Sequence, residues 1–284
     1  MMPYTEVKIN RGLTFSRKTV NNYALRNKIK ARKPVRKPKL RARHRKSRRQ
    51  FVRTCLKFAS RTKRIVFSDE KLFRSIPAFN RTLVRCRSED RFKHSNVIYT
   101  KTGGPTVNVW YCVGEFGKGP MYIAEHFDLY DHTGAKLSNV KYKGFENVSY
   151  CRMLDHHALP QLNRLTGGRP FYFQQDNAPH HCKKDKATGE PAVKPILQRH
   201  GTVAIKWPSL SPDLNVIENV HNLVQDQLDA LLSRYRPRNK KELFTLVRKA
   251  YSKVDNQKVL NIFFSFLKRC ETVHGLKGGN NYRA

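Results

Sequence analysis

The fold is decided around residues 171–181, which read FYFQQDNAPHH. The first residues of this stretch are aromatic and apolar, which predicts a short buried strand, and a polar run follows at once. Asp176 is therefore expected at the carboxyl end of a strand, where the ligand sites of open α/β sheets form. The stretch predicts an acidic group held at the edge of a sheet.

Two further acids stand at comparable positions. Residues 64–70 read RIVFSDE, which predicts a second buried strand that ends at Asp69. Residues 203–207, VAIKW, predict a third core strand, and Glu218 opens the amphipathic helix expected over 217–232. All three acids are thus expected at one edge of one sheet.

Three converging carboxylates would repel one another and raise one another's pKa values, so that only a cation makes such a cluster favourable. Oxygen ligands without a Cys/His set favour Mg²⁺ or Mn²⁺ over zinc. Two such ions would clamp the attacking and leaving oxygens of a phosphodiester displacement. The sequence therefore predicts a two-ion site made by Asp69, Asp176 and Glu218.

Taken singly, each acid also has a structural explanation. Asp69 could cap a loop, and Asp176 could cap a helix that starts near Pro179. Residues Asn215 to Glu218 match a capping box, with Asn as the N-cap and Glu at the third helical position. Taken singly, each acid is therefore better explained by a structural role than by a catalytic one.

The remaining pattern predicts one α/β domain. We expect a hairpin over 106–127 with its turn at 117–119, a helix over 145–165, and a solvated loop over 183–195. One or two helices are expected over 240–270. The order of strands and helices predicts a mixed sheet flanked by helices.

The chain of 284 residues is strongly basic, with a formal net charge of +36. Residues 1–64 hold 23 Lys and Arg and a single acid, Glu6. Such a charge favours a polyanionic partner, because each neutralised phosphate releases counterions. The first quarter of the chain is therefore interpreted as a basic arm.

Within the arm, residues 16–30 predict a short helix with Ser16 as its N-cap, and 47–59 predict another. Between them, Pro34, Pro38 and the like charges predict an extended stretch through Arg49. We interpret this stretch as having three compatible roles: a solvated linker, a DNA phosphate-binding arm and a nuclear import signal. The cations expected to contact DNA are Arg17, Lys18, Arg32, Lys33, Arg36, Lys37, Lys39, Arg41, Arg43, Arg45, Lys46, Arg48 and Arg49.

Other classes of protein are disfavoured. No two of the six cysteines have C-x-x-C spacing, which argues against a zinc ribbon or finger. No run is long and apolar enough for a signal peptide or a membrane span, and we expect free thiols in a reducing compartment.

Four blocks of sequence carry a family resemblance. They are VFSDE at 66–70, GGPTVNVWYCVGEFGKGP at 103–120, FQQDNAPHH at 173–181 and WPSLSPDLNVIEN at 207–219. In this order they resemble the catalytic-domain blocks of Tc/mariner-type transposases, above all those of the nematode Tc branch. VDNQ at 254–257 extends the similarity.

The resemblance implies an RNase H-like fold and a D-D-E triad of Asp69, Asp176 and Glu218. It implies an accessory role for His181, and Asn177 is grouped with it, while Asp213 is expected to be structural. The implied reaction is hydrolysis at the terminal inverted repeats of a transposon and strand transfer into target DNA, usually at TA. The resemblance also implies two ions of Mg²⁺ or Mn²⁺, a homodimer in a synaptic complex and a nuclear location.

The sequence departs from the family pattern in three ways. The arm resembles only the end of the second of two helix-turn-helix units, which suggests an N-terminally truncated transposase. Asp176 and Glu218 are separated by 41 residues, more than is usual in the family, and the excess fits the 183–195 loop. Val216 and His221 replace a family Pro and Trp, and we expect His221 to loosen the packing that positions Glu218.

We expect three parts: a helix-turn-helix remnant and basic linker over 1–62, an RNase H-like catalytic domain over 63–235, and a helical tail over 236–284 with a flexible end. The leading hypothesis is a metal-dependent DNA transposase. The alternative is a catalytically decayed or truncated remnant that only binds DNA without sequence specificity. A basic RNA-binding protein of the ribosomal type is a third hypothesis, and it would need neither metal nor the two acid blocks.

Overall fold

The computed structural model describes residues 16–28, 37–75, 88–90, 93, 104–124, 126, 135, 146–184 and 189–282. The chain divides into a unit over Met1–Pro38 and a larger unit over Lys39–Ala284. In the first, helix α2 (Arg17–Arg26) begins after Ser16, whose hydroxyl accepts a hydrogen bond from the Thr19 amide, as predicted. Within the described part of the chain, no helix is both long and apolar enough to cross a membrane.

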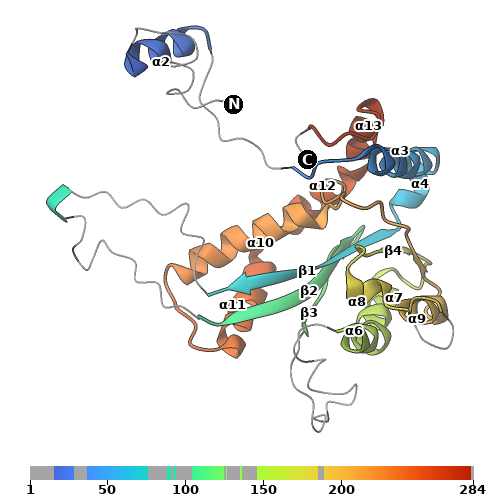
Figure 1. Cartoon of the computed structure of the whole chain (residues 1–284). Coiled ribbons are helices and arrows are strands. Elements are labelled where there is room, and N and C mark those ends of the chain that lie inside the picture. The colour runs from blue at the N-terminus through green and yellow to red at the C-terminus, as the bar shows by residue number, and fades with distance from the viewer. Residues whose placement is uncertain are drawn as a thin grey trace. The chain divides into compact units, whose positions relative to one another are not determined.

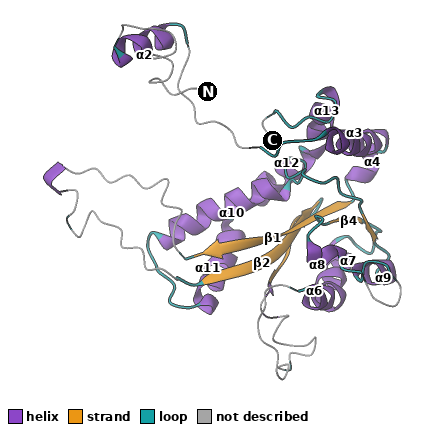
Figure 2. Ribbon diagram, viewed as in Figure 1, coloured by secondary structure: helices purple, strands orange, loops and turns teal. Residues whose placement is uncertain are grey.

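The larger unit is built on one five-stranded sheet in the order β3-β2-β1-β4-β5 (Figures 1 and 2). The strands are β1 (Ile65–Arg74), β2 (Thr106–Gly114), β3 (Gly117–Ile123), β4 (Tyr172–Gln174) and β5 (Val203–Ala204). The pairs β1–β2 and β2–β3 are antiparallel, whereas β1–β4 and β4–β5 are parallel. The predicted mixed sheet is confirmed.

The β2–β3 hairpin is confirmed, but its turn was predicted two residues too late. The turn residues are Glu115 and Phe116, and Gly117 begins β3 with a φ of 82°. A Cβ atom on Gly117 would lie 2.2 Å from the Asn256 side chain, so both the backbone angle and the close packing require glycine.

Helices cover both faces of the sheet (Figure 1). On one face lie α6 (Asn147–Met153), a π-helical segment over Leu154–Ala158, α7 (Leu159–Leu165) and α9 (Val193–Arg199), which form a core with Trp110 and Phe173. The helix predicted over 145–165 is thus present over 147–165, with a π-helical segment in its middle.

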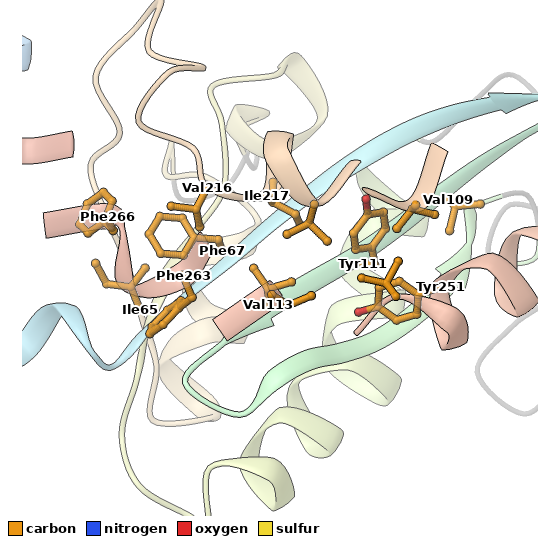
Figure 3. Packing of buried hydrophobic residues seen from close by; sticks show 14 of the residues in the cluster. Ile65, Phe67, Val109, Tyr111, Val113, Val216, Ile217, Tyr251, Phe263 and Phe266 are labelled. Carbon is orange, nitrogen blue, oxygen red and sulfur yellow. The ribbon is translucent and has the colours of Figure 1, made fainter. Parts of the chain in front are cut away.

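The opposite face is covered by α10 (Ile217–Leu232), α11 (Lys240–Lys253) and α12 (Asn256–Phe264). Figure 3 shows this core, in which Phe67, Val109 and Tyr111 point from the sheet toward these helices. Successive side chains of a strand point to opposite faces, which explains why Tyr111 and Trp110 belong to different cores. α10 has the predicted bounds, and α13 (Phe266–Gly275) adds one helix more than expected.

Two predictions about the sheet edge and the basic stretch are wrong. β5 has only two residues and Val203 is 60% exposed, because β5 is the edge strand and not a core strand. Residues from Ala42 onward are helical rather than extended, since no proline follows Pro38 there and helix α3 (Ala42–Lys57) packs on α13. The short α4 (Ala59–Thr62) follows α3.

The end of the chain over 275–284 was expected to be flexible, and the structure shows residues 276–282 packed. Gly278 has a φ of 87° and lies against the backbone of Arg45 in α3. The carbonyl groups of Gly278 and Gly279 accept hydrogen bonds from Arg48. The glycine-rich composition of this segment favoured flexibility, and the local sequence contains no information about its contact with Arg48 of α3.

Candidate active site

The register of two parallel strands sets the positions of the first two acids. The last parallel pair of β1 and β4 is Phe67 with Gln174, and Asp69 and Asp176 each lie two residues beyond it. The Ser68 hydroxyl donates to the Gln174 carbonyl at 2.8 Å and holds the two strands together at this point. The prediction that this strand ends at Asp69 is wrong, because β1 continues to Arg74 against β2.

Glu218 joins these acids from the first turn of α10. A cavity of about 300 Å³ is lined by Asp69, Asp176, Asn177 and Glu218, together with the loop over 207–212. The structure therefore brings the three predicted acids to one cavity.

The structural alternatives for the acids hold only in part. Val216 is the N-cap of α10 and no side chain caps the helix, so the predicted capping box is absent, while the Asn215 side-chain amide donates to Asp69 Oδ2 at 3.2 Å. Asp176 does accept a hydrogen bond from the Ala178 amide at 2.8 Å, next to the short helix α8 (Pro179–Cys182). Asp69 Oδ1 accepts from the Glu70 amide at 2.8 Å, so backbone and amide groups orient both carboxylates.

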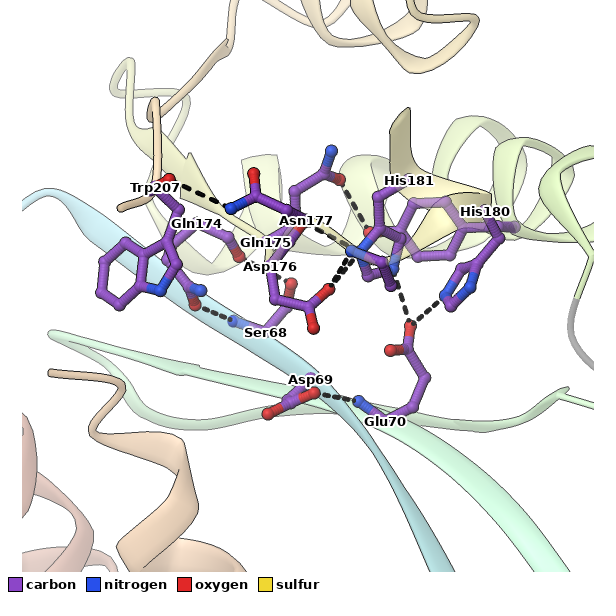
Figure 4. Close-up of polar contacts among 12 residues, drawn as sticks. Ser68, Asp69, Glu70, Gln174, Gln175, Asp176, Asn177, His180, His181 and Trp207 are labelled. Atoms are coloured by element: carbon purple, nitrogen blue, oxygen red, sulfur yellow. Dashed lines mark hydrogen bonds and ion pairs between the residues drawn. The ribbon is translucent and has the colours of Figure 1, made fainter. Parts of the chain in front are cut away.

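His181 lies between two carboxylates (Figure 4). Its Nδ1 is 2.8 Å from Asp176 Oδ1, and its Nε2 is 3.1 Å from Glu70 Oε1. Burial opposes protonation of the ring, which is 2% exposed, but the hydrogen bonds to Asp176 and Glu70 raise the pKa of His181 to about 9. His181 is therefore a cation that orients Asp176.

Glu70 is a site residue that the sequence analysis missed. Burial would raise its pKa, but contacts with His180 and His181 lower it below the usual value, while the hydrogen bond from His181 does the same for Asp176. The sequence did contain a signal for this contact, since Glu70 directly follows Asp69 and His180 directly precedes His181. The neighbouring His180 has its Nε2 3.6 Å from Glu70 Oε1.

The electrostatics around Glu218 favour a cation. Partial burial of its carboxylate and the negative charge of Asp69 raise the pKa of Glu218, although the residue as a whole is exposed at the cavity mouth. A divalent ion would remove this penalty, because it neutralises the repulsion between the acids. The donor set of carboxylate oxygens fits Mg²⁺ or Mn²⁺.

His221 was expected to loosen the packing of α10, and the structure shows it buried against Tyr111. Its ring is 2% exposed, and its edge meets the Tyr111 ring at a centroid distance of 5.1 Å. Nδ1 shares a hydrogen bond with the Tyr111 hydroxyl, and Nε2 lies 3.6 Å from Asp69 Oδ2. The histidine thus fills the position and adds a polar group beside the acids.

Asn177 connects the two strand ends that border the cavity. Its side-chain amide donates to the Trp207 carbonyl at 3.2 Å. The Trp207 ring packs edge-on against Phe51 and Phe67, with centroid distances of 5.1 and 6.3 Å. Asn177 is therefore well placed to hold the loop after β5 beside Asp176.

The predicted DNA-contacting cations fall into three groups. Arg32, Lys33, Arg36 and the Arg17 side chain lie outside the described residues. Lys18, Lys37, Lys39, Arg41 and Arg43 are exposed. Arg45, Lys46 and Arg49 line a groove of about 970 Å³ on α3, together with three cations that the sequence analysis did not include, Arg53, Lys57 and Lys277.

Arg48 is the exception among these cations. Its side chain is fully buried and forms an ion pair with Asp213, the residue expected to be structural. Arg48 is thus unavailable to DNA in this fold, and its assignment as a DNA contact is wrong. Charge pattern alone could not separate it from Arg49, its exposed neighbour.

No family model matches the chain, but individual proteins do. The Tcb2 transposase of Caenorhabditis briggsae is 26% identical over 277 residues, which cover 96% of this chain and 90% of that protein. The Tc1 transposase of Caenorhabditis elegans is 25% identical over 266 residues, with 93% and 86% covered.

Solved structures of the Mos1 mariner transposase share the fold. A paired-end complex with Mg is 16% identical, with a TM-score of 0.71 over 99% of this chain and 76% of that one. A paired-end complex with Mn has a TM-score of 0.68 over 96% and 74%. The match extends to the isolated Mos1 catalytic domain, whose fold is RNase H-like, as predicted for this chain. Over more than nine-tenths of its length the chain is similar in sequence to Tc1-type transposases, and it shares the fold of the Mos1 mariner transposase.

Proposed function

We propose that this protein is a DNA transposase that hydrolyses phosphodiester bonds at transposon ends and transfers the freed strand to target DNA. The observation that carries the proposal is the shared cavity of Asp69, Asp176 and Glu218 in a chain similar to Tc1/mariner-type transposases. Such a protein is an enzyme of the polynucleotidyl transferase type.

In this proposal Asp69, Asp176 and Glu218 form a D-D-E triad that holds Mg²⁺ or Mn²⁺, in a pair of ions. Bound ions would stabilise the charge that develops on the attacking and leaving oxygens. The chain's own part is positioning: Asn215 and the Glu70 amide fix Asp69, and His181 fixes Asp176. His181 and Asn177 are accessory residues, since each orients a part of the cavity wall.

DNA binding is assigned to the basic arm and to the groove on α3. The groove lines up six cations on one surface, and such surfaces bind phosphates through counterion release. The Mos1 structures with similar folds include paired-end complexes, one of them with a left transposon end. We infer by analogy that two copies of this chain bind a pair of transposon inverted repeats, with target sites at TA, in the nucleus.

The same proposal divides the chain into a DNA-binding region over 1–62, a catalytic domain over 63–235 and a helical tail over 236–284. Helix α3 falls within the first of these regions by sequence, while it packs in the same compact unit as the sheet. The groove on α3 would therefore bind DNA on the same compact unit that contains the catalytic sheet.

Metal-dependent cleavage tests the proposal. Purified protein is incubated with a labelled inverted-repeat duplex and Mg²⁺ or Mn²⁺, and nicked and joined products are measured. We expect Asp176→Asn and Glu218→Gln to reduce both products to background while DNA binding persists. Asp226→Asn, a change of an exposed acid on the same helix as Glu218, should cleave like the wild type.

Two outcomes would contradict the proposal. Unchanged cleavage by Asp176→Asn would show that the triad assignment is wrong. Tight DNA binding by the wild type without metal-dependent cleavage of any duplex would support the non-catalytic remnant instead.

A further inference from the structure

His221 and Glu218 lie on one face of α10, close to Asp69 of β1. They are three residues apart, in a Glu-x-x-His pattern, and residues at this spacing are neighbours on a helix surface. Helices of carboxylate-bridged metal proteins use the same pattern to direct both side chains at one ion. Ligand atoms of Asp69, Glu218 and His221 all lie within 4.8 Å of one another.

The two nitrogens of the His221 ring have different surroundings. Nδ1 shares a hydrogen bond with the Tyr111 hydroxyl, whereas Nε2 is buried and makes no hydrogen bond to any described residue. Asp69 Oδ2, at 3.6 Å from Nε2, is beyond hydrogen-bond distance. A buried nitrogen without a hydrogen bond is costly, so its position next to two carboxylates requires an explanation.

A metal ion supplies that explanation. Metal-binding histidines usually donate their other ring N–H to an oxygen, which fixes the ring and directs the free lone pair at the ion. The Tyr111 hydroxyl can accept from Nδ1–H in this way, which leaves the Nε2 lone pair facing Asp69 and Glu218. Ligands about 2.1 Å from one ion lie roughly 3–4 Å apart, so small side-chain rotations close the site.

The second histidine cluster differs in this respect. His181 has carboxylate oxygens at both of its ring nitrogens, Asp176 at Nδ1 and Glu70 at Nε2. It therefore presents no free lone pair, which makes it a matched control for His221.

We propose that Nε2 of His221 is a nitrogen ligand of a divalent ion that Asp69 and Glu218 also bind. The inference rests on the proposed function and deepens it, since it names a ligand outside the D-D-E triad. An imidazole ligand favours Mn²⁺ and later transition metals over Mg²⁺, which prefers oxygen. The chain is therefore expected to select Mn²⁺ over Mg²⁺ more strongly than an all-carboxylate site would.

Pulsed electron paramagnetic resonance of Mn²⁺-loaded protein tests the proposal without relying on activity. We expect the spectrum of the wild type to contain the coupling of a directly bound nitrogen. His221→Gln should lose that coupling and bind Mn²⁺ at least about tenfold more weakly, with a smaller change for Mg²⁺. His181→Gln should retain the coupling.

The outcomes separate this inference from the proposed function. Mn²⁺ bound to the wild type without nitrogen coupling, or coupling that persists in His221→Gln, would overturn the nitrogen ligand and leave the triad intact. A wild type that binds no Mn²⁺ would overturn both. If His221→Gln does not fold, the wild-type and His181→Gln spectra still decide, since a nitrogen ligand at His221 requires coupling in both.

Discussion

Arg48 binds both carboxylate oxygens of Asp213, with Nη1–Oδ1 and Nη2–Oδ2 distances of 2.7 and 2.6 Å. The same guanidinium group donates to the carbonyls of Gly278 and Gly279 at 3.0 and 3.2 Å. Asp213 belongs to the loop that precedes Glu218. One buried side chain therefore connects helix α3, the loop beside the acids and the segment after α13.

Arg48→Ala should lower the free energy of unfolding by about 3–5 kcal/mol, because it leaves Asp213 without its partner and removes the donor to the Gly278 and Gly279 carbonyls. Urea denaturation measures this change. Arg49→Ala removes an exposed charge from the next position and should change stability by about 0.5 kcal/mol or less. Equal effects of the two substitutions would contradict the role of the buried ion pair.

Gly278→Ala tests how closely the segment after α13 approaches α3. A Cβ atom there would lie 2.2 Å from the Arg45 carbonyl oxygen, in addition to the strain of a φ of 87°. Gly167 has a similar φ of 65° but no heavy atom within 4 Å, so Gly167→Ala measures the strain alone. Thermal denaturation should show that Gly278→Ala is less stable than Gly167→Ala by about 1–3 kcal/mol, and equal losses would indicate a loose contact.

The protonation of His181 should make the metal-free protein sensitive to alkaline pH. Contacts with Asp176 and Glu70 raise its pKa from 6.5 to about 9 in the folded state. A histidine whose pKa is higher in the folded than in the unfolded protein stabilises the fold fully at pH values below its unfolded-state pKa. This stabilisation of the fold is therefore lost as the pH rises from 6.5 to about 9.

The expected loss over this window is about 1–3 kcal/mol, measured by urea denaturation at several pH values. In His181→Gln the unfolding free energy should vary much less over the same pH window. His274, an exposed histidine in α13, provides the control, and His274→Gln should keep the wild-type dependence. A wild-type profile that is flat between these pH values would argue against a protonated His181.

The groove on α3 should contribute to the salt dependence of DNA binding. Replacing three of its cations by Gln should make the log–log slope against salt shallower by about 0.9 for each phosphate contact that is lost. Replacing three exposed cations of α11 should leave the slope unchanged if the groove is the DNA surface. The two sets, compared by fluorescence anisotropy on one duplex, are Arg45, Lys46 and Arg49 for the groove and Lys241, Arg248 and Lys249 for α11.

The spacing of apolar residues along the sequence correctly predicted helix α10 and the strands before Asp69 and Asp176. The apolar side of residues 217–232 repeats with helical spacing over the full length of α10, and its bounds were predicted correctly. The buried runs before Asp69 and Asp176 were identified as strands for the same reason. β5 was overestimated, because apolar residues at a sheet edge resemble those of a core strand in sequence.

The residues around the triad depended on register, which local pattern does not contain. Asp69 pairs with Tyr111 across β1 and β2, and this pair brings the Tyr111 hydroxyl to His221. The position of Glu70 next to His181 arises from contacts across 111 residues of sequence. Convergence of the acids could be predicted from strand ends, whereas their hydrogen-bond partners could not.

The contact between α3 and Gly278 has a consequence for how the chain folds. Arg48 and the Gly278 carbonyl are 230 residues apart in sequence, so this contact closes after nearly all of the larger unit has been synthesised. Until then, Arg48 lacks the two carbonyl groups that it binds in the segment after α13. The basic groove on α3 is thus completed late, after the strands that carry Asp69 and Asp176 have emerged from the ribosome.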